Sequence, residues 1–244
     1  MSRNPSYAGA AVLVQAALLA GCGERGDTAA AVQSNAATAG SAIAAPVATV
    51  AVRGPERLVL AFGDSLYAGY GLKRGEGLPA VIERGLRAQG IDARVVDAGV
   101  SGDTSAGGRR RLAYTLDRLD RVPDLVMLGL GGNDVLRQVD PAETRANLAA
   151  MLVELRRRKI PVVLTGMLAP PNLGPDYAGR FNAMWPELAR ANDAVLDPFI
   201  LDGVLGNRAL MLPDGVHPNA RGVVRIAGRL TPLLEKRIAA LPAG

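Results

Sequence analysis

The sequence predicts an α/β protein with a parallel sheet that is covered by helices on both faces. From about residue 57 onward, short apolar runs alternate with longer segments of helical periodicity. A helix between two such strands implies a right-handed crossover, which makes the strands parallel and places helices on both sides of the sheet. With 244 residues, 49% of them apolar, the chain is long enough for one such domain and an appendage.

The first half of the domain is predicted to contain three strands and two helices. The first strand is the apolar run at residues 57–62. The first helix spans residues 77–90, because Leu78, Ile82 and Leu86 recur every fourth residue before a terminal glycine. The other elements of this half are a strand at 93–97, a helix at 105–119 and a strand at 125–130.

The second half continues the same alternation. Pro141 begins a helix that is predicted for residues 141–159, since proline is favoured in the first helical turn. The remaining predicted elements are strands at 161–167 and 194–197 and helices at 179–190 and 219–241.

The N-terminal segment predicts export and lipid attachment. Arg3 precedes an apolar stretch at residues 8–20, and the segment ends in Leu-Ala-Gly followed by Cys22. The apolar stretch is short and rich in alanine, which argues against a membrane span. The four residues resemble the lipobox of bacterial lipoproteins, in which a diacylglyceryl group is attached to the cysteine and the chain is cleaved just before it. The alternative is an ordinary secretory signal that happens to contain a cysteine.

These features set the predicted domain boundaries. Residues 1–21 are a lipoprotein signal peptide, residues 22–54 form a flexible tether rich in Ala, Thr, Ser and Gly, and residues 55–244 form the folded domain. We expect a protein that is lipid-anchored in the bacterial cell envelope and faces the periplasm or is exported. Gly23 stands where some inner-membrane lipoproteins carry Asp, so the resemblance favours the outer membrane.

The composition excludes several kinds of site. Cys22 is the only cysteine and His217 the only histidine, so the chain can form no internal disulfide, thiolate cluster or histidine-based zinc site. The net charge of +5 includes basic runs at residues 109–111 and 156–159, which we interpret as solvated helix faces. Nucleic-acid modules need stacking aromatics, and with an aromatic content of 4% the sequence predicts no nucleic-acid partner.

Small and polar residues follow the predicted strands. They form the segments 63–66, 99–104 and 131–134, and a fourth segment, 213–219, precedes the last helix. The carboxyl ends of parallel strands meet at one rim, where α/β sheets bind ligands, so these segments should come together. Singly, each has a structural interpretation: Ser65 could cap a helix, and Gly102 could belong to a turn. Together, and with the only histidine among them, they favour a functional site.

The residue types in these segments fit acyl transfer. Ser65 could supply a nucleophilic hydroxyl, His217 a base, and Asp214, three residues earlier, an acceptor for the Nδ1 proton of that base. The backbone N–H groups of Ser65 and Gly102 and the side-chain amide of Asn133 could hold an oxyanion. Neither a Gly-x-Ser-x-Gly elbow nor a phosphate-binding or dinucleotide fingerprint is present in the sequence.

Four motifs in order, Gly-Asp-Ser-Leu, Ser-Gly-Asp-Thr, Gly-Gly-Asn-Asp and Asp-Gly-Val-His-Pro-Asn, resemble the sequence blocks of the SGNH (GDSL) hydrolases. Within this family the chain is most similar to the bacterial group of thioesterase I, protease I and lysophospholipase L1 and to its arylesterase relatives. The resemblance implies a flavodoxin-like three-layer α/β/α sandwich with five parallel strands and no metal or cofactor. It also implies that Ser65 is the nucleophile, His217 the general base and Asp214 its orienting partner, and that Gly102 and Asn133 complete the oxyanion hole with Ser65.

We therefore expect a serine esterase that hydrolyses small carboxylic esters or thioesters through an acyl-enzyme. A groove lined by Leu66, Val135, Leu168 and Pro170 is expected to take a short-to-medium acyl or aryl group, and residues 168–175 resemble the family's loop beside that groove. Val135 stands where soluble relatives usually carry glycine, which leaves the acyl length open.

Two alternatives remain. One is a carbohydrate O-deacetylase of the same fold, which the scarcity of aromatic residues for sugar stacking disfavours. The other is a non-catalytic envelope lipoprotein, which is disfavoured because binding alone does not require a nucleophile, a base, an orienting acid and oxyanion donors together.

Overall fold

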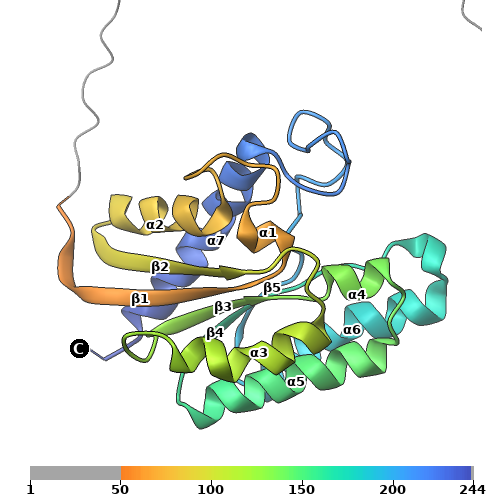
Figure 1. The fold of residues 1–244 in the computed structure, drawn as a ribbon, viewed down its shortest axis with the longest axis horizontal. Helices are drawn as coiled ribbons and strands as arrows, with labels where there is room; N and C mark the ends of the chain where they lie inside the picture. The colour runs from red at the N-terminus through yellow and green to blue at the C-terminus, as the bar shows by residue number, and fades with distance from the viewer. Residues whose placement is uncertain (1–50, 243–244) are drawn as a thin grey trace, which may run out of the picture. The chain divides into compact units, whose positions relative to one another are not determined.

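The computed structural model describes residues 51–242, which form a five-stranded parallel sheet between two layers of helices (Figure 1). The strand order is β2-β1-β3-β4-β5. In chain order the strands are β1 (Arg53–Gly63), β2 (Ile91–Gly99), β3 (Leu125–Gly129), β4 (Val162–Thr165) and β5 (Val195–Asp197). The predicted three-layer α/β/α fold with five parallel strands is confirmed.

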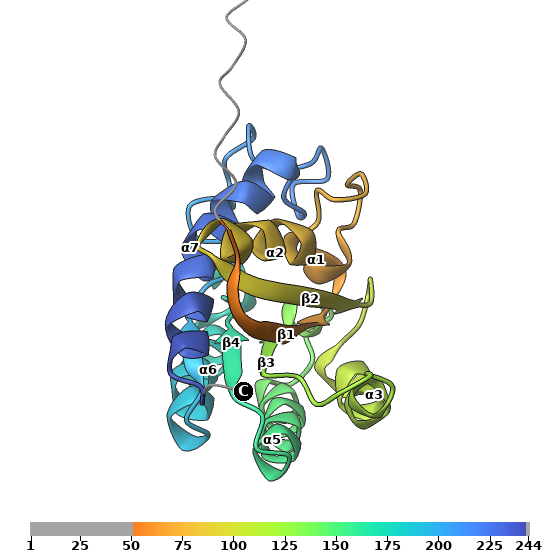
Figure 2. The ribbon, with the colours of Figure 1, turned by 90° about the vertical axis from the view of Figure 1, so that its left-hand side faces the viewer.

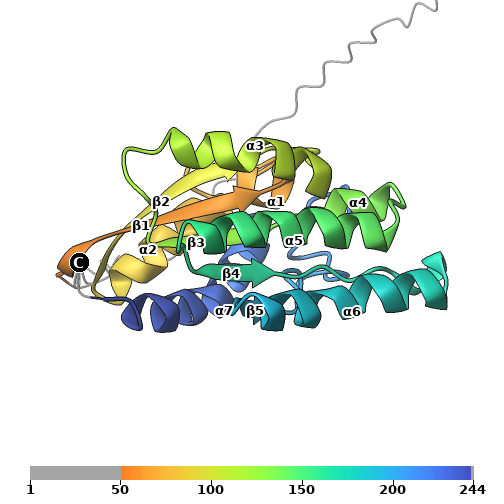
Figure 3. The same cartoon turned by 90° about the horizontal axis from the view of Figure 1, so that it is seen from below.

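The helices divide between the two faces of the sheet (Figures 1 and 3). One face is covered by α1 (Ser65–Ala68), α2 (Leu78–Ala88) and α7 (Ala220–Ala239). The other face is covered by α3 (Ser105–Asp117), α5 (Pro141–Arg157) and α6 (Pro175–Ala191). Two short helices, α4 (Gly132–Leu136) and the 3-10 helix η1 (Pro171–Leu173), lie in the connections after β3 and β4.

The central strands are buried on both faces, which explains their continuous apolar runs. In β1, Leu60 and Phe62 pack into the layer of α3, α5 and α6, whereas Val59 and Ala61 pack into the layer of α1, α2 and α7. All four side chains are fully buried. Because successive side chains of a strand point to opposite faces, only a strand that is covered on both sides needs an unbroken apolar sequence.

The strand order places a switch in direction at β1. The crossover from β1 leads to β2 on one side, and the next crossover returns to β3 on the other side of β1 (Figures 1 and 2). In a doubly wound sheet the loops on the two sides of such a switch diverge and leave a crevice at the carboxyl ends of the strands. The segments that contain Ser65, Gly102 and Asn133 all begin at this end of the sheet.

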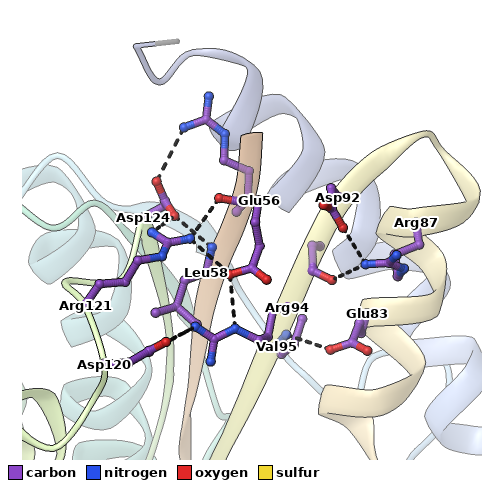
Figure 4. Close-up of polar contacts among 12 residues, drawn as sticks. Glu56, Leu58, Glu83, Arg87, Asp92, Arg94, Val95, Asp120, Arg121 and Asp124 are labelled. Carbon is purple, nitrogen blue, oxygen red and sulfur yellow. Dashed lines mark hydrogen bonds and ion pairs between the residues drawn. The ribbon is translucent and has the colours of Figure 1, made fainter. Parts of the chain in front are cut away.

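Strand β1 begins four residues earlier than predicted. Arg53 pairs with Ile91 and Arg57 with Ala93, with a break in register between them. Ion pairs surround this extension (Figure 4). Arg94 pairs with Glu56 at 3.1 Å, and an Asp124 carboxylate oxygen accepts a hydrogen bond from the backbone N–H of Leu58 at 2.7 Å. Polar contacts of this kind leave no apolar periodicity in the sequence, which is why the extension was not predicted.

Some helix boundaries also differ from the prediction. Helix α6 begins at Pro175, four residues before the predicted start, because Pro175 occupies the first helical turn after Gly174. The short helices α4 and η1 were not predicted, since helices of one turn contain no full apolar period.

Several predictions fall on residues that the structure does not describe. The predicted signal peptide at residues 1–21, the predicted lipidation of Cys22 and the predicted tether up to residue 50 lie outside the described residues. Between residues 51 and 242, no helix combines the length and the apolar character needed to cross a membrane.

Candidate active site

A row of three glycines supports the helix that carries Ser65. Gly63, at the end of β1, is in register with Gly99 on β2 and Gly129 on β3. A Cβ atom on any of the three would overlap α1, at Tyr67 over Gly63 and Gly129 and at the backbone of Ala68 over Gly99. The glycines therefore let α1 lie directly on the sheet, with Ser65 as its first residue at the rim.

Tyr67 fixes α1 on this glycine row. Its ring is fully buried, and its hydroxyl lies 2.8 Å from Oγ1 of Thr165 at the end of β4. The Tyr67 side chain thus connects the helix that carries Ser65 to β4 through a hydrogen bond that is shielded from water.

Asp64, not Ser65, caps α1. The Asp64 carboxylate accepts a hydrogen bond from the backbone N–H of Leu66 at 3.0 Å. Asp64 is only 3% exposed, and burial raises its pKa to about 6. The interpretation of Ser65 as a helix cap is therefore wrong, and its hydroxyl is left for a different partner.

Ser65, His217 and Asp214 form one chain of hydrogen bonds. Ser65 Oγ lies 2.9 Å from Nε2 of His217, and Nδ1 of the same ring lies 2.7 Å from Oδ2 of Asp214. With Nδ1 protonated toward the carboxylate, Nε2 is the free acceptor for the serine proton. The structure thus brings together three side chains from opposite ends of the domain.

The turn at residues 214–217 also fixes the carboxylate. Oδ1 of Asp214 accepts hydrogen bonds from the backbone N–H groups of His217 at 3.0 Å and Val216 at 2.9 Å. The N–H of His217, together with its ring and the N–H of Val216, lowers the pKa of Asp214 to about 2. The carboxylate is therefore ionised at any pH at which the imidazole could act as a base.

Tyr70 covers one face of the imidazole and was not predicted. The centroids of the Tyr70 and His217 rings are 4.4 Å apart, at an interplanar angle of 34°. Tyr70 follows α1 in the loop that leads to α2, so the contact joins segments far apart in the sequence. The one available signal was an aromatic residue between two glycines soon after the serine.

Three N–H donors lie beside the same cavity as the serine hydroxyl. Within residues 51–242, the backbone N–H groups of Ser65 and Gly102 have no acceptor. Asn133 Nδ2 donates one hydrogen to the backbone oxygen of Asp103 at 2.9 Å, which leaves its second hydrogen free. Gly102 has a φ of 82°, a conformation that disfavours any residue with a side chain.

The hydroxyl and the donors open into a cavity of about 770 Å³. The four side chains predicted to form a groove, Leu66, Val135, Leu168 and Pro170, all line it. Further apolar residues that were not predicted contribute to its wall: Leu136, Met167, Phe199, Leu201, Leu205 and Val216. Most of these come from the connection between β5 and α7, which showed no periodicity in the sequence.

In the part of the chain that the structure describes, no three His, Cys, Asp or Glu side chains are close enough to bind a metal ion. The polar residues that line the cavity include Ser65, His217 and Asn133.

A hydroxyl that is hydrogen-bonded to an imidazole can lose its proton as it attacks a carbonyl carbon, and donors beside it can stabilise the oxyanion that forms. This chemistry at the rim of a parallel α/β sheet is that of a serine hydrolase. The chain belongs to the GDSL-like Lipase/Acylhydrolase family, whose sequence profile matches residues 61–224. The predicted family is confirmed.

Named relatives agree with this assignment. The chain is 40% identical over 177 residues to "Esterase TesA" of Pseudomonas aeruginosa, covering 72% of this chain and 87% of the relative. It is 35% identical over 161 residues to "Thioesterase 1/protease 1/lysophospholipase L1" of Escherichia coli, covering 66% and 75%. The crystal structure of AlinE4, an SGNH-hydrolase family esterase, matches with 50% identity and a TM-score of 0.65, covering 78% of this chain and all of that one.

One basic run requires a correction. Arg109 and Arg110 are exposed on α3, as predicted for a solvated helix face, but Arg111 is not. Its side chain is 21% exposed, and its guanidinium faces the carboxyl ends of β1 and β2. Within one run of three arginines, only the position on the helix determined which side chain would face the sheet.

Proposed function

We propose that the protein hydrolyses small acyl esters and thioesters through an acyl-enzyme on Ser65. The observation that carries this proposal is the 2.9 Å separation between Ser65 Oγ and His217 Nε2 at the base of an apolar cavity. In the first step, Ser65 Oγ attacks the carbonyl carbon while His217 Nε2 takes its proton. The Asp214 carboxylate stabilises the resulting imidazolium.

The donors and the imidazole then complete the reaction. The N–H groups of Ser65 and Gly102 and the amide of Asn133 stabilise the negative charge on the carbonyl oxygen. His217 returns its proton to the leaving alcohol or thiol as the bond to the carbonyl carbon breaks. Water, deprotonated by the same imidazole, releases the acid from Ser65 by the reverse sequence.

The cavity supports an apolar acyl or aryl group of short to medium length. Its volume of about 770 Å³ lies within the usual range of small-molecule sites, and its walls are mainly aliphatic. One relative is named an esterase and another a thioesterase, so both bond types are included in the proposal.

The proposal is tested with p-nitrophenyl esters from acetyl to palmitoyl, using the wild type and the variant Ser65→Ala. We expect activity on short-to-medium chains in the wild type and a loss in kcat of about 10⁴-fold or more in the variant. Unfolding midpoints of both proteins control for folding. Undiminished hydrolysis by Ser65→Ala would exclude the mechanism.

The same assay separates the alternatives. A sharp optimum at acetyl, together with release of acetate from acetylated glycans, would favour a carbohydrate O-deacetylase. A folded wild type that hydrolyses none of the esters would favour a binding lipoprotein without catalytic activity.

We further propose that the protein is attached to the cell envelope through lipid on Cys22, with the outer membrane preferred. The proposal rests on the sequence motif, since Cys22 lies outside the described residues. Each buried methylene contributes about 0.8 kcal/mol, so two or three acyl chains would give stable attachment. The variant Cys22→Ser should leave the membrane fraction of cells that express the full chain, and unchanged fractionation would contradict lipid attachment.

A further inference from the structure

Arg111, on α3, binds the ends of two strands and the loop that follows the second of them. Its Nη2 donates to the carbonyl oxygen of Gly63 at 2.9 Å, and its Nη1 donates to the carbonyl oxygen of Ala98 at 2.8 Å. Its Nε donates to the carboxylate of Asp103 at 2.7 Å. Each of the three nitrogens therefore has an acceptor, and the acceptors lie on three separate segments.

The surroundings make these contacts strong. The guanidinium lies over the ring of Phe62, 3.8 Å from its centroid, and the Asp103 side chain is only 10% exposed. Charge-assisted hydrogen bonds that are shielded from water are stronger than exposed ones, and a carboxylate buried to this degree needs a partner. We therefore expect the guanidinium and its three acceptors to keep fixed positions relative to one another.

These acceptors are adjacent to the proposed oxyanion donors. Gly63 lies two residues before Ser65, and Asp103 directly follows Gly102. The backbone oxygen of Asp103 also accepts the hydrogen bond from Asn133 Nδ2 at 2.9 Å. One guanidinium thus connects the strand end that leads to Ser65 with the loop that carries Gly102 and holds Asn133.

Other side chains also contact this region, but none of the contacts described next connects the end of β1 to the loop that carries Gly102 through a side chain. Arg137 donates to the carbonyl oxygen of Gly102 at 2.9 Å, and Asp134 accepts from the backbone N–H of Ser105 at 2.8 Å. The first contact joins the loop to the residue that follows α4, and the second joins the first residue of α3 to α4. On the β1 side, the carbonyl oxygen of Gly63 accepts from Arg111 and from the backbone N–H of Val100, the latter at 3.0 Å.

We propose that Arg111 is a positioning residue that sets the separation between the Ser65 N–H and the donors of Gly102 and Asn133. The inference rests on the proposed function, because it assigns a role in stabilising the oxyanion. Arg111 does not line the cavity, so it acts through the groups it binds. Donors hold an oxyanion only at hydrogen-bond distance, so a shift of the loop would lower kcat more than substrate affinity.

The test compares Arg111→Gln with Arg110→Gln, a matched control on the exposed side of the same helix. kcat and KM are measured with p-nitrophenyl acetate and p-nitrophenyl octanoate. The concentration of active sites, which is needed for kcat, is determined by titrating each protein to completion with a fluorophosphonate. We expect Arg111→Gln to lower kcat by about 10- to 100-fold, by the same factor for both esters, with KM changed less than about threefold. Arg110→Gln should match the wild type.

A double variant tests the contact with Asp103. Asp103→Asn removes the buried carboxylate, so the combination Asp103→Asn/Arg111→Gln should lose less activity than the product of the two single losses. If Arg111→Gln yields no folded protein, Arg111→Lys takes its place, because lysine keeps the charge but cannot bind three acceptors at once.

The proposal is overturned if kcat per active site is the same for Arg111→Gln and Arg110→Gln. It is also overturned if Arg111→Gln raises KM instead of lowering kcat, or if the factor by which kcat falls differs between the two esters. The proposal also fails if the loss of activity in the double variant equals the product of the losses in Asp103→Asn and Arg111→Gln. A wild type that is active and dependent on Ser65 separates these outcomes from failure of the proposed function. A wild type whose hydrolysis does not depend on Ser65 would overturn both.

Discussion

Asp64 and Ser65 are adjacent, yet their side chains have opposite surroundings. The Asp64 carboxylate is buried and caps α1, whereas the Ser65 hydroxyl faces the imidazole and the cavity. A helix of one turn has several unsatisfied N–H groups at its start, and Asp64 satisfies that of Leu66. The serine hydroxyl is therefore free of any structural role in the helix that carries it.

The buried carboxylate of Asp64 predicts an unusual dependence of stability on pH. Its pKa is about 6 in the folded protein and 3.8 in an ordinary environment. Between these values the folded state binds more protons than the unfolded state, so the free energy of unfolding falls as pH rises. The total change corresponds to about 3 kcal/mol.

The variant Asp64→Asn isolates this effect, because asparagine can still accept the hydrogen bond from Leu66. Urea unfolding of both proteins between pH 4 and 8 should show the wild type losing stability relative to the variant as pH rises, with the difference levelling off above about pH 7. A constant difference in unfolding free energy across this range would show that Asp64 is not a buried acid with a raised pKa.

Asn133 carries the only side-chain donor in the proposed oxyanion hole. Its removal in Asn133→Ala should lower kcat by about 10² to 10³-fold, equivalent to about 2.7 to 4 kcal/mol of transition-state stabilisation. Asn192→Ala, an asparagine that follows α6 and does not line the cavity, is the matched control and should leave kcat unchanged. If kcat of the Asn133 variant stayed within about threefold of the wild type, the donor would have to be another group.

At the scale of elements, the row of Gly63, Gly99 and Gly129 decides where α1 can lie. The glycines end three neighbouring strands in register, and Tyr67 occupies the space that side chains would fill. A strand end normally carries side chains that would keep a helix away from the sheet. The position of Ser65 therefore depends on the absence of side chains on two strands other than its own.

Two glycine substitutions test this arrangement. In Gly129→Ala, the new methyl group would overlap Tyr67 and Thr165, which should lower the free energy of unfolding by about 1 to 3 kcal/mol and reduce kcat. Gly228→Ala, at an exposed position of α7 with open space around it, should instead raise stability by about 0.5 to 1 kcal/mol. Equal effects of the two substitutions on unfolding would contradict the close packing of α1.

The strands and the polar segments after them could be predicted because each depends on local sequence. Apolar runs identified the central strands, and the parallel topology alone implied that Ser65, Gly102 and Asn133 share one rim. Tyr70 and Arg111 were missed because their roles depend on packing between distant elements. The start of β1 was missed because ion pairs with β2 and with the loop before β3, not apolar burial, stabilise it (Figure 4).

At the scale of the whole molecule, the site exists only when the sheet is complete. Ser65 and His217 are 152 positions apart, and the strand order brings the loops after β1, β2 and β3 to the segment that precedes α7. Ser65, His217 and the N–H donors of Gly102 and Asn133 line one cavity. The topology thus converts four short polar segments, none of them sufficient alone, into one site.

The central claim is that Ser65 forms a covalent acyl-enzyme with the help of His217. A p-nitrophenyl alkylphosphonate reacts with such a serine to give a stable adduct and releases one p-nitrophenolate per site. We predict one adduct per chain by intact mass, located on the peptide that contains Ser65, absent from Ser65→Ala and formed far more slowly in His217→Gln. An adduct of full yield in Ser65→Ala, or none in a wild type that hydrolyses esters, would contradict the account.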